Sequence, residues 1–234
     1  IAFVLLHLLR TFWHGVYKGP REMTWFFGAL LLMVTLGFGF TGYLLPWDQR
    51  AFWATTVGTD IAGSVPLVGD FLRQLLRDGP EVTGLTLTRF FGVHVLVLPA
   101  SLLAALGVHV YLIHHHGIAE APHAPETASG VEKLKRKLVP FFPNYTLGEF
   151  MAWYMVLALL IILCSVFPAG LEDKANPLVT PEHVKPEWYF LGVYQFLKVA
   201  GELRPILGPQ APILVGLAVP GIVVALLVVL PFLD

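Results

Sequence analysis

The sequence is poor in cysteine and in charged residues, and both shortages narrow what the protein can be. Its 234 residues include one cysteine, Cys164, which excludes an internal disulfide and a Cys-x-x-Cys-His site for covalent haem. We interpret Cys164 as a small apolar residue within a helix. Charged residues make up 13% of the chain, against about 25% in soluble domains. With a formal net charge of −1, the chain is expected to be a membrane protein that binds no nucleic acid.

What the sequence has instead is a series of apolar segments, most of them near the roughly 20 residues that cross a bilayer. They cover residues 1–16, 23–45, 86–116, 149–168 and 209–232. These segments predict an all-α membrane protein, a transmembrane bundle of about five helices. Both ends of the sequence lie inside apolar stretches, so we expect a fragment whose first span is truncated.

The connections between these segments differ in character. Residues 47–80 contain two phrases, 61–66 and 70–77, that are typical of short amphipathic helices at a membrane interface. Residues 169–187 form a proline-rich loop, and 188–200 are expected to form a short helix. We divide the chain into an N-terminal bundle (1–116), an inner-side linker (117–148) and a C-terminal part (149–234).

Basic residues predict the topology, because Lys and Arg concentrate in loops on the inner side of a membrane. The first loop holds Lys18 and Arg21, with Arg10 just inside the span. The linker holds Lys133, Lys135, Arg136 and Lys137. We therefore place both connections inside, and 47–80 and 169–187 outside.

Two histidines, His94 and His109, lie in one apolar run with no other ionisable residue between them. Fifteen residues of helix rise about 22 Å over about four turns, so both rings lie near one face at opposite membrane depths. Ionisable residues inside a span are costly and indicate function. Because neutral imidazole is a common iron ligand, the pair predicts one helix that holds two haems at two depths.

His109 needs a partner at the inner depth, and the first segment offers His7 and His14. His109 lies eight residues before Gly117, and His7 lies eight residues before Gly15, whereas His14 lies at that boundary itself. Depth therefore favours His7. We expect the remaining histidines near span ends to be interfacial, namely His14, His114, His115 and His116.

His94 finds no partner at the outer depth within the sequence. A helix extended about fourteen residues upstream of His7 would reach that depth, so we predict a histidine there. Gly28 and Gly42 are fourteen residues apart in the second segment, at matching depths. Glycine permits a flat macrocycle to approach the backbone, although small residues also serve helix packing.

Two arginines, Arg10 and Arg89, lie near the two expected haem levels. A guanidinium group suits the carboxylates of haem propionates. Arginine at the end of a span is also a common interfacial anchor. Both interpretations stay open on sequence alone.

Several phrases spread over the chain resemble one known family. They are His7-x-x-Arg10, Pro20-Arg21-Glu22, Gly42-Tyr43-Leu44-Leu45-Pro46-Trp47, Thr86-Leu87-Thr88-Arg89-Phe90-Phe91 and Pro186-Glu187-Trp188-Tyr189. Together they resemble cytochrome b of the bc-type quinol:cytochrome c (or plastocyanin) oxidoreductases. Asp48 and the long His94–His109 spacing are similar to the chloroplast type. The unbroken chain, with the linker phrase 140–146, resembles a fused bacterial form.

The resemblance implies two haems b, with His94 at the outer, low-potential haem and His7 with His109 at the inner, high-potential haem. It also implies that an outer pocket for quinol oxidation is bordered by Tyr43, Pro186, Glu187, Trp188 and Tyr189. Thr56 resembles a position near that pocket, and Ala54 stands where many members have glycine.

The resemblance further implies an enzyme of the bacterial inner membrane that oxidises quinol outside, reduces quinone inside and translocates protons. Its partners would be a Rieske iron–sulfur protein, a c-type cytochrome, lipid and a second copy of the complex. Glu187 is the expected general base, or alternatively a loop-capping carboxylate.

Two other functions remain alternatives. A dihaem membrane anchor would only conduct electrons to a separate reductase, and a transporter would use its membrane histidines as a proton relay. The anchor needs neither the Glu187 loop nor a long interfacial connection. The transporter would show no haem spectrum.

Overall fold

The computed structural model describes residues 1–117, 140–182, 185–208, 212 and 215–234, and within them it contains helices and no strand. The only extended pairing there is an isolated bridge between Asp48 and Lys174. Three helical stretches are long and apolar enough to cross a membrane: 22–44, 84–116 and 141–166. The prediction of an all-α membrane protein is confirmed.

The chain forms two compact units. The first unit combines residues 1–118 with 172–234, and the second comprises 119–171. The second unit contains η2 (Phe141–Tyr145) and α8 (Thr146–Val166), the expected fourth span. His94, His109, Gly28, Gly42 and the loop with Glu187 all belong to the first unit. The four basic residues of the linker lie outside the described residues.

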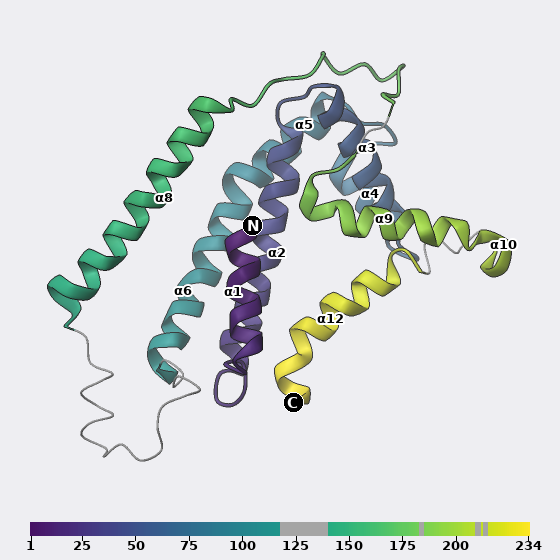
Figure 1. The fold of residues 1–234 in the computed structure, drawn as a ribbon. Coiled ribbons are helices and arrows are strands. Elements are labelled where there is room, and N and C mark those ends of the chain that lie inside the picture. The colour runs from purple at the N-terminus through teal and green to yellow at the C-terminus, as the bar shows by residue number, and fades with distance from the viewer. Residues whose placement is uncertain (118–139, 183–184, 209–211, 213–214) are drawn as a thin grey trace. The chain divides into compact units, whose positions relative to one another are not determined.

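The first unit contains the remaining helices (Figure 1). They are α1 (Ala2–Trp13), α2 (Glu22–Leu44), α3 (Gln49–Gly63), α4 (Gly69–Arg77), α5 (Gly84–Gly92), η1 (Val93–Val97), α6 (Leu98–His116), α9 (Trp188–Glu202), α10 (Arg204–Leu207) and α12 (Ala218–Leu233). The expected helix at 61–66 is wrong: these residues are the end of α3 and the turn after it. α3 begins earlier because Asp48 caps it, its side chain accepting from the Ala51 N–H at 2.8 Å.

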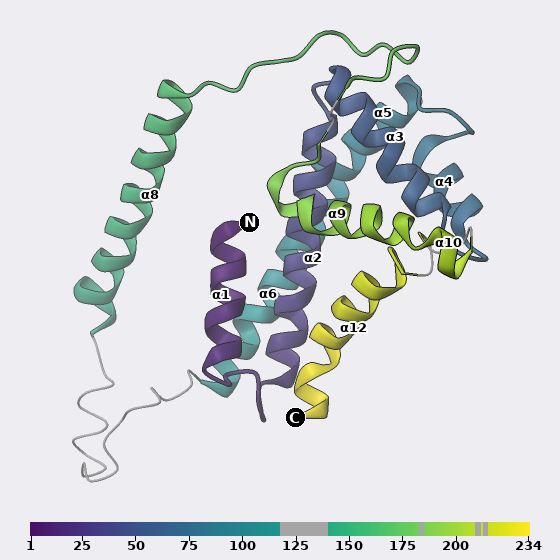
Figure 2. The same ribbon diagram turned by 45° about the vertical axis from the view of Figure 1, so that its right-hand side comes forward.

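α2 and α6 lie side by side along their length (Figures 1 and 2) and form the centre of this unit. Each helix also has a small side chain that is fully or nearly fully buried, Ala29 on α2 and Ala105 on α6. Within lipid, no hydrophobic effect drives helices together, so their association depends on close packing. Small residues allow two helix backbones to approach closely enough for it. α2 carries Gly28 and Gly42, α6 carries His109, and η1, which continues directly into α6, carries His94.

At one end of α2, the helices α3, α4 and α5 are joined by a buried arginine. The Arg77 side chain is 5% exposed and forms an ion pair with Asp60 at 2.8 Å. It also donates to Thr59 Oγ1 at 2.6 Å and to the Thr56 carbonyl at 2.7 Å. A buried guanidinium is tolerated only when its donors are satisfied, so this network holds α4 against α3.

At the other end of α2, α12 docks through polar contacts. Trp25 donates its indole N–H to the Leu227 carbonyl at 2.7 Å. Tyr17 donates to Asp234 at 2.6 Å, and Lys18 pairs with Asp234 at 2.8 Å. These bonds bring the C-terminal segment onto the loop between α1 and α2, the side expected to be inner.

Candidate functional site

His109 lies against α2 with one ring nitrogen already bonded. Its Nδ1 is 2.9 Å from the Thr24 carbonyl, and a carbonyl can only accept. Nδ1 is therefore the protonated nitrogen, which leaves the lone pair on Nε2. The ring covers Gly28, where an added Cβ would lie 3.2 Å from His109 Cε1. His7 lies on α1, which contacts α2.

His94 has the same arrangement one level away, with a side chain in place of the carbonyl. Its Nδ1 is 2.8 Å from Thr41 Oγ1. The Thr41 hydroxyl donates its own proton to the Gly37 carbonyl at 2.8 Å, so it must accept from His94. Nε2 of His94 therefore also carries the lone pair. An added Cβ at Gly42 would lie 2.8 Å from His94 Cε1.

These observations fit haem iron as the group that the two histidines hold. A bis-histidine haem needs a neutral imidazole with Nε2 free and Nδ1 held by a partner that orients the ring. Both His94 and His109 meet this requirement. Because Gly28 and Gly42 have no side chain, the α2 backbone is uncovered where the His109 and His94 rings lie against it.

A cavity of about 770 Å³ lies between α2, α3, α9 and the loop that precedes α9. This volume falls within the usual range for small-molecule sites. The lining comprises Leu36, Gly37, Phe40 and Tyr43 of α2, Trp53, Ala54, Val57, Gly58 and Ile61 of α3, Thr180, Pro181, Lys185, Pro186 and Glu187 of the loop, and Tyr189, Phe190, Val193, Tyr194, Leu197 and Lys198 of α9. The wall is mostly apolar, with a few polar groups.

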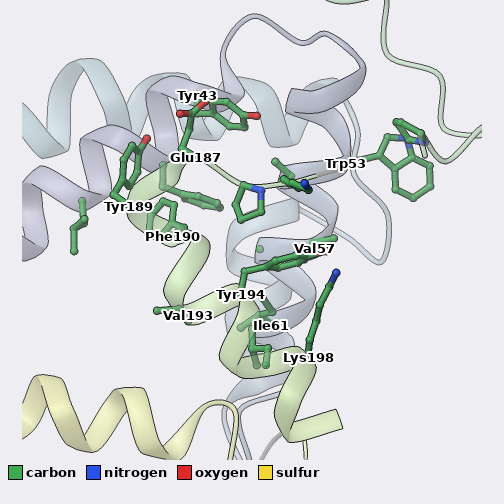
Figure 3. A pocket seen from close by; sticks show the side chains of 18 of the residues that line it. Tyr43, Trp53, Val57, Ile61, Glu187, Tyr189, Phe190, Val193, Tyr194 and Lys198 are labelled. Atoms are coloured by element: carbon green, nitrogen blue, oxygen red, sulfur yellow. The ribbon is translucent and has the colours of Figure 1, made fainter. Parts of the chain in front are cut away.

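The polar groups divide between the two ends of the cavity (Figure 3). Tyr43, Glu187 and Tyr189 gather at one end, and Lys198 lies at the other, beside Ile61. Tyr43 Oη is buried and has no hydrogen-bond partner among the described residues. A buried hydroxyl without a partner is costly, so Tyr43 is available to a ligand.

Tyr189 links the cavity with the helix that faces His94. Its Oη would lie 3.0 Å from a Cβ added at Gly39, one turn before Gly42 on α2. Burial, followed by the charge of Glu187, raises the pKa of Tyr189. Tyr189 is therefore neutral at physiological pH and packs between the cavity and the α2 backbone.

The loop that carries Glu187 is fastened to the start of α3. Gln49 accepts from the Asn176 N–H at 2.6 Å and donates to the Val179 carbonyl, which Trp53 also contacts at 3.1 Å. Arg50 pairs with Glu172. Since Trp53 and Thr180 both line the cavity, these bonds close one of its walls.

Three residues that the sequence placed at the quinol pocket or at a haem propionate contact other groups in the structure. Trp188 does not line the cavity and is 55% exposed, because neighbouring helical side chains point about 100° apart. Thr56 precedes the lining residue Val57 but bonds back to Phe52 at 3.0 Å. Arg89 pairs with Asp78 and donates to two carbonyls of α4. Its role at a propionate stays a prediction.

Sequence reasoning missed most of the cavity wall. Phe40, Val57, Ile61, Phe190, Val193 and Leu197 come from three helices that are remote in the chain. Their spacing on α9 (190, 193, 197) is a helical stripe, which predicts a buried face without saying what it covers. Lys198 also lines the cavity, but its side chain is exposed, and nothing in the sequence pattern indicates that it does so.

Comparison with known proteins decides the family. Residues 1–174 match the family described as cytochrome b(N-terminal)/b6/petB, and residues 174–234 match cytochrome b(C-terminal)/b6/petD. The chain belongs to the cytochrome b family. The resemblance seen in the sequence phrases is thereby confirmed.

Relatives of this cytochrome b come from several bacteria. It is 42% identical over 88% of its length to "Cytochrome bc complex cytochrome b subunit" of Chlorobaculum thiosulfatiphilum, covering 48% of that protein. It is 36% identical over 83% of its length to "Cytochrome b" of Cereibacter sphaeroides, covering 45%. The chain thus spans about half of the length of the curated relatives it matches.

A solved structure supports the same fold. A chain of "Hyperthermophilic respiratory Complex III" superposes with a TM-score of 0.77 and 33% identity, covering all of this chain and 60% of that one. The helical arrangement of this cytochrome b is therefore similar to that of the matched chain.

Proposed function

We propose that this chain is the dihaem, quinol-oxidising core of a bc-type complex. The observation that carries the proposal is the cavity that joins Tyr43 of α2 with Glu187 and Tyr189, beside the helix face that meets His94. An enzyme that removes electrons from a bound substrate needs an electron acceptor close to the substrate pocket, and a haem held by His94 would lie against the helix that lines this cavity.

His94 would hold one haem b and His7 with His109 the other. Each free Nε2 would be an axial ligand, while Thr41 and the Thr24 carbonyl orient the rings. The histidine expected upstream of His7 would complete the ligands of the first haem. Bound in this way, the two haems supply one-electron transfer between two membrane depths.

In the cavity, a quinol would place one hydroxyl at the end lined by Tyr43 and Glu187. Quinol oxidation releases two protons and two electrons per molecule. The Glu187 carboxylate takes a proton from the hydroxyl, and Tyr43 Oη offers the hydrogen bond that it makes to no described residue. The apolar walls exclude water from the ring.

The partners follow from this chemistry. One of the two electrons would pass to a Rieske iron–sulfur protein and then to the c-type cytochrome. The other would stay in this chain, for the transfer between membrane depths that haems held by His94 and by His7 with His109 would supply. We expect the iron–sulfur protein to be a separate subunit of the complex. Lipid would surround the three long helices, and two complexes would pair as a homodimer in a bacterial inner membrane.

The alternative of a dihaem anchor is less well supported. An anchor that only conducts electrons needs no substrate cavity with a polar end. Here such a cavity is present, and the loop with Glu187 that lines it is fastened to the start of α3 through Gln49 and Arg50. Normal electron conduction without any quinol-dependent reduction would favour the anchor.

Glu187→Gln tests the assignment of the base. We expect quinol oxidation to slow by about 10²–10⁴-fold, because a positioned base contributes that much. Reduced-minus-oxidised spectra should still show both haems b. The matched control is Glu182→Gln, since Glu182 is exposed on the same loop and should keep normal turnover. Normal turnover of Glu187→Gln would contradict its role.

A further inference from the structure

The helix that carries both histidines contains one widened turn, Val93–Val97, and His94 is its second residue. α5, η1 and α6 form one continuous helix from Gly84 to His116. Within it, the Val93 N–H bonds to Arg89 in the regular way, but the Leu98 N–H bonds to Val93, five residues back. This is a π-helical turn, which takes one residue more than an α-helical turn. Such turns are rare in proteins overall, and those that occur often lie at functional sites.

Helix geometry shows why an extra residue would matter here. Gly28 and Gly42 are fourteen residues apart, two heptads, so they differ by about 40° around α2 at about 100° per residue. His94 and His109 are fifteen residues apart. In a regular helix they would differ by about 60° in the opposite sense. The two helices could then match one histidine to one glycine, but not both.

The widened turn removes this mismatch. It absorbs one residue without adding rotation, so the fifteen-residue interval turns like an interval of fourteen. The result is seen at both levels, where His109 covers Gly28 and His94 covers Gly42. Two-heptad spacing on both helices is also the repeat that keeps two packed helices facing each other.

The sequence offers a local cause for the position of the turn. Pro99 opens α6, lacks an N–H and crowds the carbonyl four residues back, Val95. A regular α-helix is therefore already interrupted between His94 and Pro99. The extra residue is accommodated where the proline already prevents one regular backbone hydrogen bond, so few further hydrogen bonds are lost.

We propose that the π-turn at Val93–Val97 is a register device that sets the orientation of His94 toward the outer haem. The proposal rests on the proposed function, in which His94 and His109 hold haems at two depths. It predicts an asymmetry: the interval between the histidines tolerates the loss of one residue but not the gain of one. No regular helix would show this.

The test uses the full-length protein in its complex. Deletion of Leu96, which is 70% exposed, should convert the π-turn into a regular turn and leave both haems bound. Insertion of one alanine between Val95 and Leu96 should rotate His94 away and lose the outer haem alone. The measurements are haem per protein, the separate spectra of the two haems, and a cryo-EM map of the backbone after His94.

Two further variants keep the result decisive. Deletion of Val97 is a second way to shorten the same turn and should also keep both haems. Deletion of Leu30 removes one residue from α2, which has no widened turn between Gly28 and Gly42, and should lose a haem. Loss of the outer haem, or failure to accumulate, in both π-turn deletions would overturn the inference. Absence of haem from the unaltered protein would instead overturn the proposed function.

Discussion

The two histidine sites of the long helix are alike in outline and different in what holds them. His109 is oriented by a backbone carbonyl, that of Thr24, in a stretch of regular helix. His94 is oriented by a side chain, that of Thr41, at the edge of a π-turn. The first site therefore depends on main-chain geometry, and the second depends on a particular residue and on a particular irregularity.

The contact with glycine differs in the same direction. An added Cβ would be 3.2 Å from the ring at Gly28 and 2.8 Å at Gly42. The second distance is shorter than real Cβ contacts, so something there must move. The His94 site is thus the tighter and more easily disturbed of the two, and it lies against α2, which also lines the cavity. Mutations can test this difference.

The largest effect is expected from removing a ligand. His109→Ala should abolish the inner haem and leave the haem at His94, because the two sites are separate levels of one helix. Haem per protein and the separate spectra of the two haems would show it. His114→Ala, at an exposed position near the end of α6, is the control and should keep both haems. Loss of both haems from a folded His109→Ala protein would show that the levels are not independent.

The next effect should come from the glycines. Gly42→Ala places a methyl group where the His94 ring lies, so we expect weaker binding of the outer haem and a shifted potential. Gly28→Ala, at the looser contact, should disturb the inner haem less. Redox titration of both variants measures the two effects under the same conditions. Equal disturbance at both levels would remove the distinction drawn from the two distances.

A smaller effect is expected from Thr41→Val, which keeps the shape and removes the acceptor of the His94 N–H. Loss of such a partner typically weakens a metal site about 10–100-fold. Thr24→Val is the matched control, because Thr24 orients His109 through its backbone, and its own hydroxyl has no partner among the described residues. Haem-loss rates should rise only in Thr41→Val. A comparable rise in Thr24→Val would contradict the conclusion that His94 is oriented by a side chain and His109 by a main-chain carbonyl.

The smallest effect is expected at the inner end, where Lys18 and then Tyr17 lower the pKa of Asp234 by hydrogen bonding. A lowered pKa stabilises the fold above the ordinary value of about 4, and this contribution is lost as the pH falls through the lowered value. Asp234→Asn should therefore melt slightly below the unaltered protein at pH 7, and the gap should close in acid. A gap that widens in acid would contradict the assignment.

Much of the span pattern could be predicted from composition alone. Segments 23–45 and 86–116 correspond to helices 22–44 and 84–116 within two residues. The histidine pair and the glycine pair were visible as spacings. Their mutual placement, ring on glycine at both levels, agrees with the depths expected for them. The assignment of these residues to haem stays a prediction.

The cavity and the turn could not be predicted in the same way. α3 starts at Gln49, well before the phrase that looked amphipathic, because capping by Asp48 outweighs the apolar pattern. The loop before α9 closes the cavity through bonds to Gln49, more than a hundred residues earlier in the chain. The π-turn lies just before Pro99, and no periodicity of the apolar residues indicates where a helix takes an extra residue.

The sequence by itself determined that this is a helical membrane protein of the cytochrome b family, because hydrophobic length and short motifs are local properties of a chain. Only the tertiary structure decided which nitrogen of each histidine is free, which residues wall the cavity, and how fifteen residues on one helix match fourteen on another. These depend on contacts between segments remote in the chain, which no local pattern encodes.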